Sequence, residues 1–304
     1  MSKRNDKVDK SIISDPFYDL PKYFEAIRIF NDFKERLNNN KVKNDGSDEL
    51  LSIIDQHILD GKSNPFSATI SKGRTLFRAR VVNPEEMMYE KGFGLDRETN
   101  NLLGYNETES REPPLGISGA GRNNYKGATY IYLSNNPATA CSEIKPKIRQ
   151  IISLAEFETL DTIKIIDFSS KKVLKSEDKF NMGRLISEIM FMYFMPVTNE
   201  KDYFASQYLT DYIRKTGIDG ISYRSYYDET GINYTIFNSD HRKLKFCGSR
   251  LVLFQSESKV FLDFNNQNVF TSNSVGGKEF DFDSTLKMRH NIIVSESNIN
   301  KENK

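Results

Sequence analysis

The order in which strand-like and helix-like segments follow one another limits the fold of this chain more than any other feature of its sequence. Strand patterns cluster at both ends of the central part of the chain, and two long helical patterns stand next to each other between them. Strands are expected at residues 75–82, 128–134, 151–160, 161–169, 219–225, 232–237 and 250–255, and the long helices at 182–195 and 202–217. A regularly alternating α/β chain would place a helix after each strand, so this order predicts an α+β fold.

Two further helical patterns precede this central part. The first places Tyr23, Ile27, Phe30 and Phe33 at helical spacing, and the second is the stretch LLSIIDQHILDG. Beyond residue 265 the chain is rich in Asn, Ser and charged residues and has few apolar groups to bury, so a loosely ordered tail is expected. The chain is therefore divided into a helical extension at 1–70, a principal domain at 71–262 and a tail at 263–304.

Composition argues against several classes of protein. The net charge of +1 argues against a nucleic-acid partner, because such binding depends on neutralising phosphates. Two distant cysteines, Cys141 and Cys247, argue against a disulfide framework and against a zinc site. The chain starts without an apolar signal segment and contains no run long enough to span a membrane, so a cytoplasmic location and no membrane partner are expected.

Arginine side chains at two places could bind phosphate. Strand alternation puts Arg78 and Arg80 on one face of their strand, where two guanidinium groups could bind phosphate oxygens; the alternative is a solvated strand face. Arg122 lies in the loop GRNNYKG at 121–127, whose glycines would let the backbone approach a ligand; the alternative is a plain turn. This loop has neither a Walker ending nor a GxGxxG pattern, which excludes the standard nucleotide cradles.

A glutamate and a serine complete the candidate groups. Tyr132 lies on a strand that leads into a short helix carrying Glu143, where a shielded carboxylate would need nearby cations; the alternative is a surface glutamate. Tyr223 and Ser225 stand at the end of a later strand, in a cluster of tyrosines. Because the three histidines are isolated and GxSxG is absent, Ser225 is expected to act through hydrogen bonds and not as a nucleophile.

In their order and spacing these elements resemble the RES family, which takes its name from arginine, glutamate and serine. The resemblance covers about residues 73–255. It rests on Phe77–Arg78, on Gly121, Arg122, Asn124 and Gly127, on Tyr132, Thr139, Ala140, Glu143 and Pro146, and on Asp219, Gly220, Tyr223 and Ser225. The chain departs from the family pattern at Asn123, where an aromatic is usual, at Lys145, where Arg is frequent, and at Arg224, where Pro is common.

This resemblance implies an ADP-ribosyltransferase-like fold and an enzyme that degrades NAD at its nicotinamide–ribose bond. NAD would be the substrate, with no further cofactor and no metal, and inorganic phosphate is a second candidate ligand. The implied catalytic residues are Glu143, Arg78 and Ser225, and the implied substrate-binding residues are Arg122, Tyr132, Arg80 and Tyr223. The family consists largely of bacterial toxins that an antitoxin of the Xre type neutralises, so such a partner is expected here.

Several alternatives stay open at the level of sequence. The acceptor of the ADP-ribosyl group could be water, inorganic phosphate or a protein side chain, which would give a glycohydrolase, a phosphorylase or an ADP-ribosyltransferase. A non-catalytic module that binds a nucleotide or nucleic acid is a different class of function, and a purely structural protein is another. Neither the role of residues 1–70 nor the oligomeric state, including a homodimer, is fixed by the sequence.

Overall fold

The computed structural model describes most of the chain between residues 20 and 271. The described residues are 20–43, 45–59, 65–83, 94–96, 101–169, 182–197, 199–237, 242–256, 260–263 and 269–271. Most of the tail expected at 263–304 lies outside these residues, as does the side chain of Tyr23. Strand β12 (Val269–Thr271) lies within the tail region and extends the sheet.

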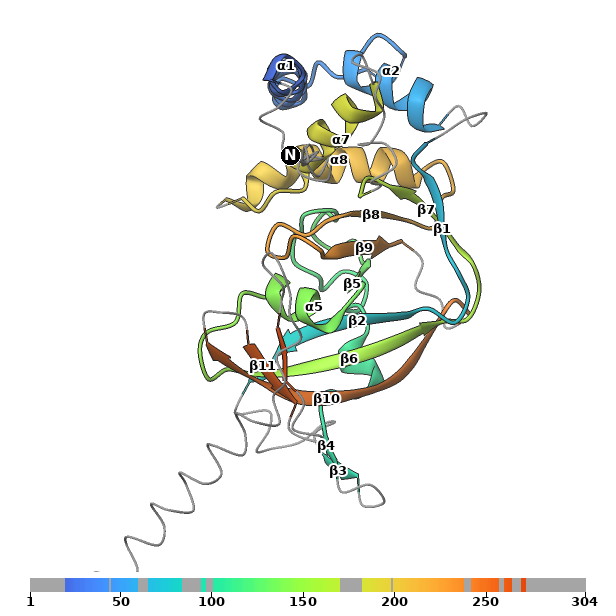
Figure 1. The fold of residues 1–304 in the computed structure, drawn as a ribbon. Helices are drawn as coiled ribbons and strands as arrows, with labels where there is room; N and C mark the ends of the chain where they lie inside the picture. Colours follow the sequence, from blue (N-terminus) through green and yellow to red (C-terminus); the bar gives the residue numbers. More distant parts are fainter. Residues whose placement is uncertain are drawn as a thin grey trace, which may run out of the picture.

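Four helices gather in a layer above one end of the sheet (Figure 1). The described helices are α1 (Leu20–Asn38), α2 (Glu49–Ile54), continued by a π-helical turn (Asp55–Leu59), α4 (Glu107–Ser110), α5 (Pro137–Glu143), α7 (Met182–Tyr193) and α8 (Phe204–Arg214), with a 3-10 turn at Glu200–Tyr203 before α8. The layer consists of α1, α2, α7 and α8. These positions confirm the two N-terminal helices and the two central helices that the sequence predicts.

The N-terminal helices share a core with the central ones. In α1 the residues Ala26, Ile29, Phe33 and Leu37 recur every three or four positions, so they form one apolar face, and all four are buried. Phe33 packs edge-on against Tyr193 of α7, with ring centroids 6.1 Å apart. The extension therefore packs on the principal domain as part of one hydrophobic cluster.

The described strands form one sheet. They are β1 (Ser67–Ile70), β2 (Thr75–Val81), β3 (Gly94–Asp96), β4 (Asn101–Leu103), β5 (Ile131–Ser134), β6 (Ile151–Thr159), β7 (Ile163–Asp167), β8 (Gly220–Arg224), β9 (Ile232–Ile236), β10 (Leu244–Ser256), β11 (Val260–Asp263) and β12. Their order is β1-β7-β8-β9-β5-β2-β6-β10-β11-β12, and β4 joins β3 to β10. The pair β7–β8 is parallel, with α7 and α8 in the connection between them, whereas the other described pairs are antiparallel. The α+β prediction is confirmed.

Register decides which side chains share a face of the central strands. Residues that pair directly across neighbouring strands point to the same side, and successive residues point to opposite sides. The helix-covered face therefore carries Phe77, Tyr132, Ser134, Tyr223, Asn233 and Thr235. The opposite face carries Arg78, Leu133, Ser222 and Tyr234.

Among the residues described, none of the helices combines the length and the apolar character needed to cross a membrane.

Candidate active site

Helix α5 places Glu143 at the edge of the helix-covered face. Asn136 caps the start of the helix, since its side-chain oxygen accepts a hydrogen bond from the Thr139 amide at 2.8 Å, and Pro137 occupies the first turn, where a missing amide hydrogen costs nothing. Residues Ala140 and Cys141 pack on the apolar cluster that includes Ala79. Glu143 is the last residue of the helix, so its side chain extends beyond that packed region.

The carboxylate of Glu143 is held by two donors, one from the loop after β8 and one from β9. Its Oε1 accepts a hydrogen bond from Ser225 Oγ at 2.6 Å and another from Asn233 Nδ2 at 2.6 Å. Its Oε2 lies 3.9 Å from Nη2 of Arg122, at the long end of an ion pair. About a fifth of the side chain is exposed, at 21%, so a ligand can reach the carboxylate. One oxygen is thus fixed in place while the other faces the cation.

The guanidinium of Arg122 approaches the site from the glycine loop. Ser206 and Gln207 of α8 hold this loop, because their side chains donate hydrogen bonds to the carbonyls of Arg122 at 2.5 Å and Gly121 at 2.7 Å. The guanidinium lies over the ring of Tyr223, 5.6 Å from its centroid. Its Nη1 atom is buried without a hydrogen-bond partner among the described residues. An unsatisfied buried donor is costly, by about 1–3 kcal/mol, and an anionic ligand would remove that cost.

Electrostatics keep Arg122 charged despite its burial. Burial acts to lower the pKa of Arg122, but attraction to Tyr223, to Glu143 and to Tyr203 outweighs it, and the pKa is raised. The side chain is only 11% exposed. A fixed positive charge with little solvent around it interacts strongly with a bound anion.

Tyr132 holds the glycine loop through hydrogen bonds of its hydroxyl group. Its hydroxyl donates a hydrogen bond to Asn124 Oδ1 at 2.7 Å and accepts one from the Asn123 amide at 3.1 Å. A Cβ atom on Gly121 would lie 2.3 Å from that Asn124 oxygen and 3.0 Å from the Tyr132 hydroxyl, so this position has no room for a side chain. Burial raises the pKa of Tyr132 well above its usual value. The hydroxyl is therefore neutral and engaged in holding the loop.

The loop after β8 fixes Ser225. Its hydroxyl oxygen accepts hydrogen bonds from the amides of Tyr227 at 3.1 Å and Asp228 at 3.2 Å while donating its hydrogen to Glu143. Asp228 is buried and accepts a hydrogen bond from Thr139 Oγ1 of α5 at 2.6 Å. The hydroxyl of Ser225 is thus held by two backbone amides and donates its hydrogen to the carboxylate, which fits a role in orienting Glu143.

Arg78 and Arg80 do not join this cluster. The side of β2 that carries Phe77 and Ala79 packs against α5, so the two arginines project from the opposite face. Arg78 donates hydrogen bonds from Nη1 to the carbonyls of Ser110, at 2.6 Å, and of its neighbour Arg111. Burial, followed by repulsion from Arg80, lowers the pKa of Arg78 to about 10. Arg78 therefore anchors the backbone that follows α4.

Arg80 has its own partners on that side of β2. It lies over the ring of Tyr105, 4.7 Å from the centroid, and pairs with the Glu109 carboxylate of α4 at 3.2 Å. The structure therefore brings together Glu143, Arg122, Tyr132, Tyr223 and Ser225 and leaves the two β2 arginines apart from them.

Sequence reasoning missed two asparagines of the site. Asn233 donates to Glu143 and its own Oδ1 accepts from Ser134 Oγ at 2.8 Å, which fixes the orientation of the amide. Asn123 donates from its side chain to Thr235 Oγ1 at 2.7 Å, so it ties the glycine loop to β9. Strand alternation puts Asn233 and Thr235 on one face, but no local signal tells which loops and helices reach that face.

Comparison with known proteins finds a family model that matches part of the chain. Residues 104–248 match the family model described as the RES domain. This range contains Arg122, Tyr132, Glu143, Tyr223 and Ser225 and begins after Arg78 and Arg80. A search of curated proteins finds no match.

A solved structure also resembles the chain. The structure titled "Crystal structure of the M.tuberculosis MbcT-MbcA toxin-antitoxin complex" matches it at 12% sequence identity. The match covers 60% of this chain and 85% of the other, with a TM-score of 0.33. A TM-score of this size is too low to establish a common fold.

Proposed function

This chain carries a RES domain at residues 104–248, and from that premise we propose that it is an enzyme that cleaves the bond between nicotinamide and ribose in NAD. The single observation that best supports the proposal is the arrangement of Glu143. Its carboxylate is oriented by Ser225 and Asn233 and lies 3.9 Å from the buried Arg122 guanidinium. A preorganised carboxylate beside a phosphate-binding cation is what such a reaction requires.

In the proposed reaction the bond between C1′ of the ribose and the nicotinamide nitrogen breaks. The electron pair leaves with the nitrogen, so nicotinamide becomes neutral and positive charge develops on the sugar, as in glycoside cleavage. The ionised Glu143 faces this charge and stabilises the transition state. Arg122 binds the diphosphate through its buried, unpartnered Nη1, and the Tyr223 ring beneath it helps to hold the guanidinium in place.

Tyr132, Ser225 and Asn233 act as positioning residues in this scheme. Tyr132 holds the glycine loop, while Ser225 and Asn233 fix the rotamer of Glu143 through hydrogen bonds to the same oxygen. Arg78 lies on the opposite face of β2, where it anchors the backbone of residues 110–111. The phosphate-binding role in this scheme is therefore assigned to Arg122.

An acceptor oxygen then bonds to C1′, and a water acceptor releases one proton to solvent. With water the product is ADP-ribose, with inorganic phosphate it is a phosphorylated ADP-ribose, and with a protein side chain it is an ADP-ribosylated target. We propose hydrolysis or phosphorolysis, with transfer to a protein as the alternative. Mass spectrometry of the products of NAD, with and without phosphate, separates the three.

The test of the active site is the loss of NAD with purified protein. Replacing Glu143 by Gln removes the negative charge and keeps the shape, so turnover should fall about 10²–10³-fold. Glu35→Gln, on an exposed position of α1, is the matched control and should keep full activity. Full activity in Glu143→Gln would refute the role of the carboxylate, and tight NAD binding without cleavage by the native chain would instead establish a non-catalytic nucleotide-binding module.

We further propose that the protein acts as a toxin and that a partner protein of the Xre type neutralises it. The RES domain supports this role. Expression of the chain in a bacterium should deplete NAD and stop growth, and Glu143→Gln should relieve both effects. Co-expression with the gene next to its own should restore growth by forming a complex that can be isolated. Growth arrest with normal NAD would separate toxicity from the proposed chemistry.

A further inference from the structure

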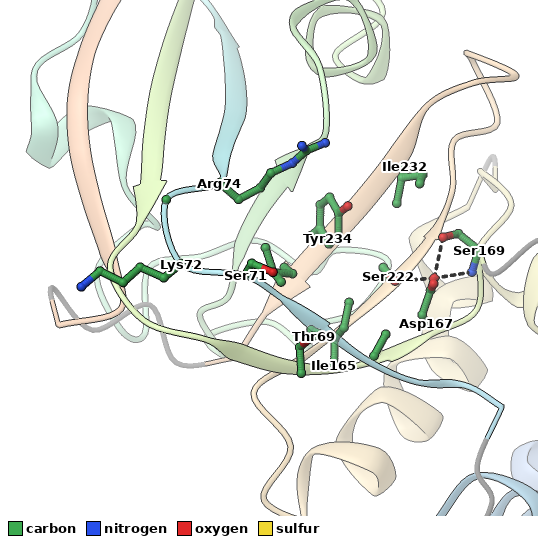
Figure 2. Close-up of a pocket in the computed structure, with 13 residues that line it drawn as sticks. Thr69, Ser71, Lys72, Arg74, Ile165, Asp167, Ser169, Ser222, Ile232 and Tyr234 are labelled. Atoms are coloured by element: carbon green, nitrogen blue, oxygen red, sulfur yellow. Dashed lines mark hydrogen bonds between the residues drawn. The ribbon is translucent and has the colours of Figure 1, made fainter.

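A cavity lies on the opposite face of the sheet, away from Glu143. It has a volume of about 410 Å³ and opens between the β1–β2 turn and the strands β7, β8 and β9 (Figure 2). Ser222 and Tyr234 line it, whereas their sequence neighbours Tyr223 and Asn233 point to the helix-covered face. The volume falls in the range of small-molecule sites, which is about 300–1,000 Å³. The cavity is therefore separate from the site proposed for NAD.

One end of this cavity carries an oriented carboxylate. Oδ1 of Asp167 accepts hydrogen bonds from Ser222 Oγ at 2.7 Å, from Ser169 Oγ at 2.5 Å and from the Ser169 amide at 2.9 Å (Figure 2). These three donors fix the carboxylate group. Its second oxygen, Oδ2, has no hydrogen-bond partner among the described residues and remains available to accept hydrogen bonds from a ligand.

The other end carries Arg74 on a firmly held turn, and Figure 2 shows the side chain of Lys72, from the same turn, extending away from it. Lys72 and Arg74 belong to the connection between β1 and β2, and neither has an ion-pair partner among the described residues. Thr159 of β6 holds this connection. Its hydroxyl accepts a hydrogen bond from the Arg74 amide at 2.8 Å, and its carbonyl accepts one from the Gly73 amide at 2.7 Å. The backbone that presents the cations is thus fixed while their side chains stay exposed.

An aromatic ring connects the two ends. Figure 2 shows Tyr234 between Arg74 and Asp167. Burial raises the pKa of the Tyr234 hydroxyl, the Asp167 carboxylate raises it further, and Arg74 lowers it. Tyr234 therefore lies close enough to both charged groups to interact with each of them. The cavity therefore offers a cationic end, a flat ring and an acceptor end, and its charged side chains sum to a net positive charge.

We propose that this cavity binds a pentose 5-phosphate, either as the free sugar phosphate or as part of a mononucleotide. Arg74, which lies beside Tyr234 in Figure 2, would hold the phosphate, since guanidinium groups are usual partners of phosphate oxygens. The sugar hydroxyls would donate to Oδ2 of Asp167, in the way that an acidic residue binds ribose hydroxyls in dinucleotide sites. Tyr234 would pack against the sugar or the base. A ligand without an anionic group would leave the Arg74 guanidinium unused.

The experiment is isothermal titration of the full-length chain with ribose 5-phosphate, AMP and inorganic phosphate. These probes lack the bond that NAD cleavage breaks, so the result does not depend on the proposed enzyme activity. Arg74→Ala should lower the affinity for ribose 5-phosphate at least about tenfold, because a charge-assisted hydrogen bond is lost. Asp167→Asn keeps an acceptor for Ser169 and Ser222. It should lower the affinity for ribose 5-phosphate by about the same factor and leave the affinity for inorganic phosphate unchanged.

Control variants separate this cavity from the Glu143 site. Lys164→Ala removes an exposed cation of β7 that does not line the cavity, so it should leave binding unchanged. Arg122→Ala should also leave it unchanged. Tighter binding of AMP than of ribose 5-phosphate would support the proposal and identify a nucleotide, whereas equal affinities would support it with the base outside the cavity.

Three results would overturn the proposal. The first is no saturable binding of ribose 5-phosphate or AMP. The second is binding that Arg122→Ala removes and that Arg74→Ala and Asp167→Asn leave intact. The third is an equal affinity for inorganic phosphate and ribose 5-phosphate, because the sugar would then contribute nothing. Circular dichroism of each variant verifies that the fold is retained.

Discussion

The two faces of strands β8 and β9 differ in how their polar groups are satisfied. On the helix-covered face, Asn233 and its neighbours bond to one another and to Glu143, so the donors are already oriented before any ligand arrives. On the opposite face, the cations Lys72 and Arg74 lie exposed around a cavity and have no ion-pair partner among the described residues. The first arrangement suits catalysis, which needs fixed charges, and the second suits reversible binding of a charged ligand.

The largest expected effect tests whether the two faces are independent. Asn233→Asp keeps the shape of the side chain but replaces the donor to Glu143 by a second carboxylate. Repulsion between the two carboxylates should cut NAD turnover by about 10²-fold or more. The comparison variant is Tyr234→Phe, one residue along the strand, which should leave NAD turnover unchanged. Equal effects of both changes on the rate of NAD loss would show that the faces are coupled.

The next effect concerns the glycine loop beside the active site. Gly121→Ala would place a Cβ against Asn124 and Tyr132, so the free energy of unfolding should fall by about 1–3 kcal/mol. Gly119→Ala, two residues before this loop, is the control, because its Cβ would meet no atom within 4 Å, and its effect should stay within about 0.5 kcal/mol. Urea unfolding measures both. A Gly121→Ala variant as stable as Gly119→Ala would contradict the close packing of this loop.

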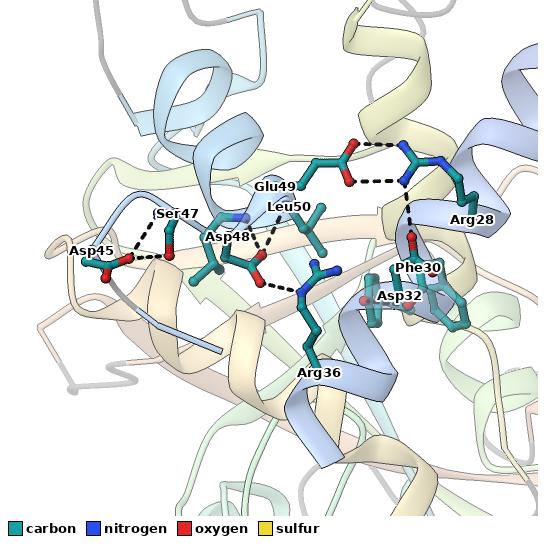
Figure 3. Close-up of polar contacts among 11 residues, drawn as sticks. Arg28, Phe30, Asp32, Arg36, Asp45, Ser47, Asp48, Glu49 and Leu50 are labelled. Carbon is teal, nitrogen blue, oxygen red and sulfur yellow. Dashed lines mark hydrogen bonds and ion pairs between the residues drawn. The ribbon is translucent and has the colours of Figure 1, made fainter. Parts of the chain in front are cut away.

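The smallest expected effect concerns an exposed ion pair between α1 and α2, outside both faces, and it gives a baseline for exposed charges. Arg28 of α1 pairs with Glu49 of α2 at 2.8 Å and with Asp32 at 3.1 Å (Figure 3). The Arg28 and Glu49 side chains are 50% and 44% exposed, so the pair should contribute no more than about 1 kcal/mol. Glu49→Gln should therefore lower the free energy of unfolding only slightly.

The pH dependence of this pair has a defined sign. Hydrogen bonding to Arg28 lowers the pKa of Glu49 below its usual value of 4.5 in the folded state. The stabilisation is thus fully present above that usual value and is lost as the pH falls through the lower, folded value. The difference in unfolding free energy between Glu49→Gln and the native chain should accordingly vanish in acid. A difference that persists there would mean that the contribution of Glu49 is not ionic.

Local patterns gave most of the elements of this fold. The apolar spacing of α1 and the cap and proline at the start of α5 are signals carried by neighbouring residues, and both helices form where those signals stand. The positions of Arg122, Glu143 and Ser225 on a loop, a helix and a strand end were also predictable, because each lies beside clear turn or capping residues.

The partners of these residues could not be predicted in the same way. Ser225 and Asn233 bond to one oxygen of Glu143, although they lie 82 and 90 residues away from it in the chain. These contacts depend on how β8, β9 and α5 come together. Asp167 and Ser222 meet in the cavity on the opposite face for the same reason, since β7 and β8 pair although two helices separate them in the chain. No local pattern contains this information.

The sequence by itself determined that Arg78 and Arg80 share one side of their strand, because side chains alternate along any extended chain. Only the tertiary structure decided which side that is. The pairing of Phe77 with Ser134 turns Phe77 toward α5 and the helix-covered face, so Arg78 points away from Glu143. A shift of one residue in this register would reverse the two, and register is set by packing across strands that lie far apart in the chain.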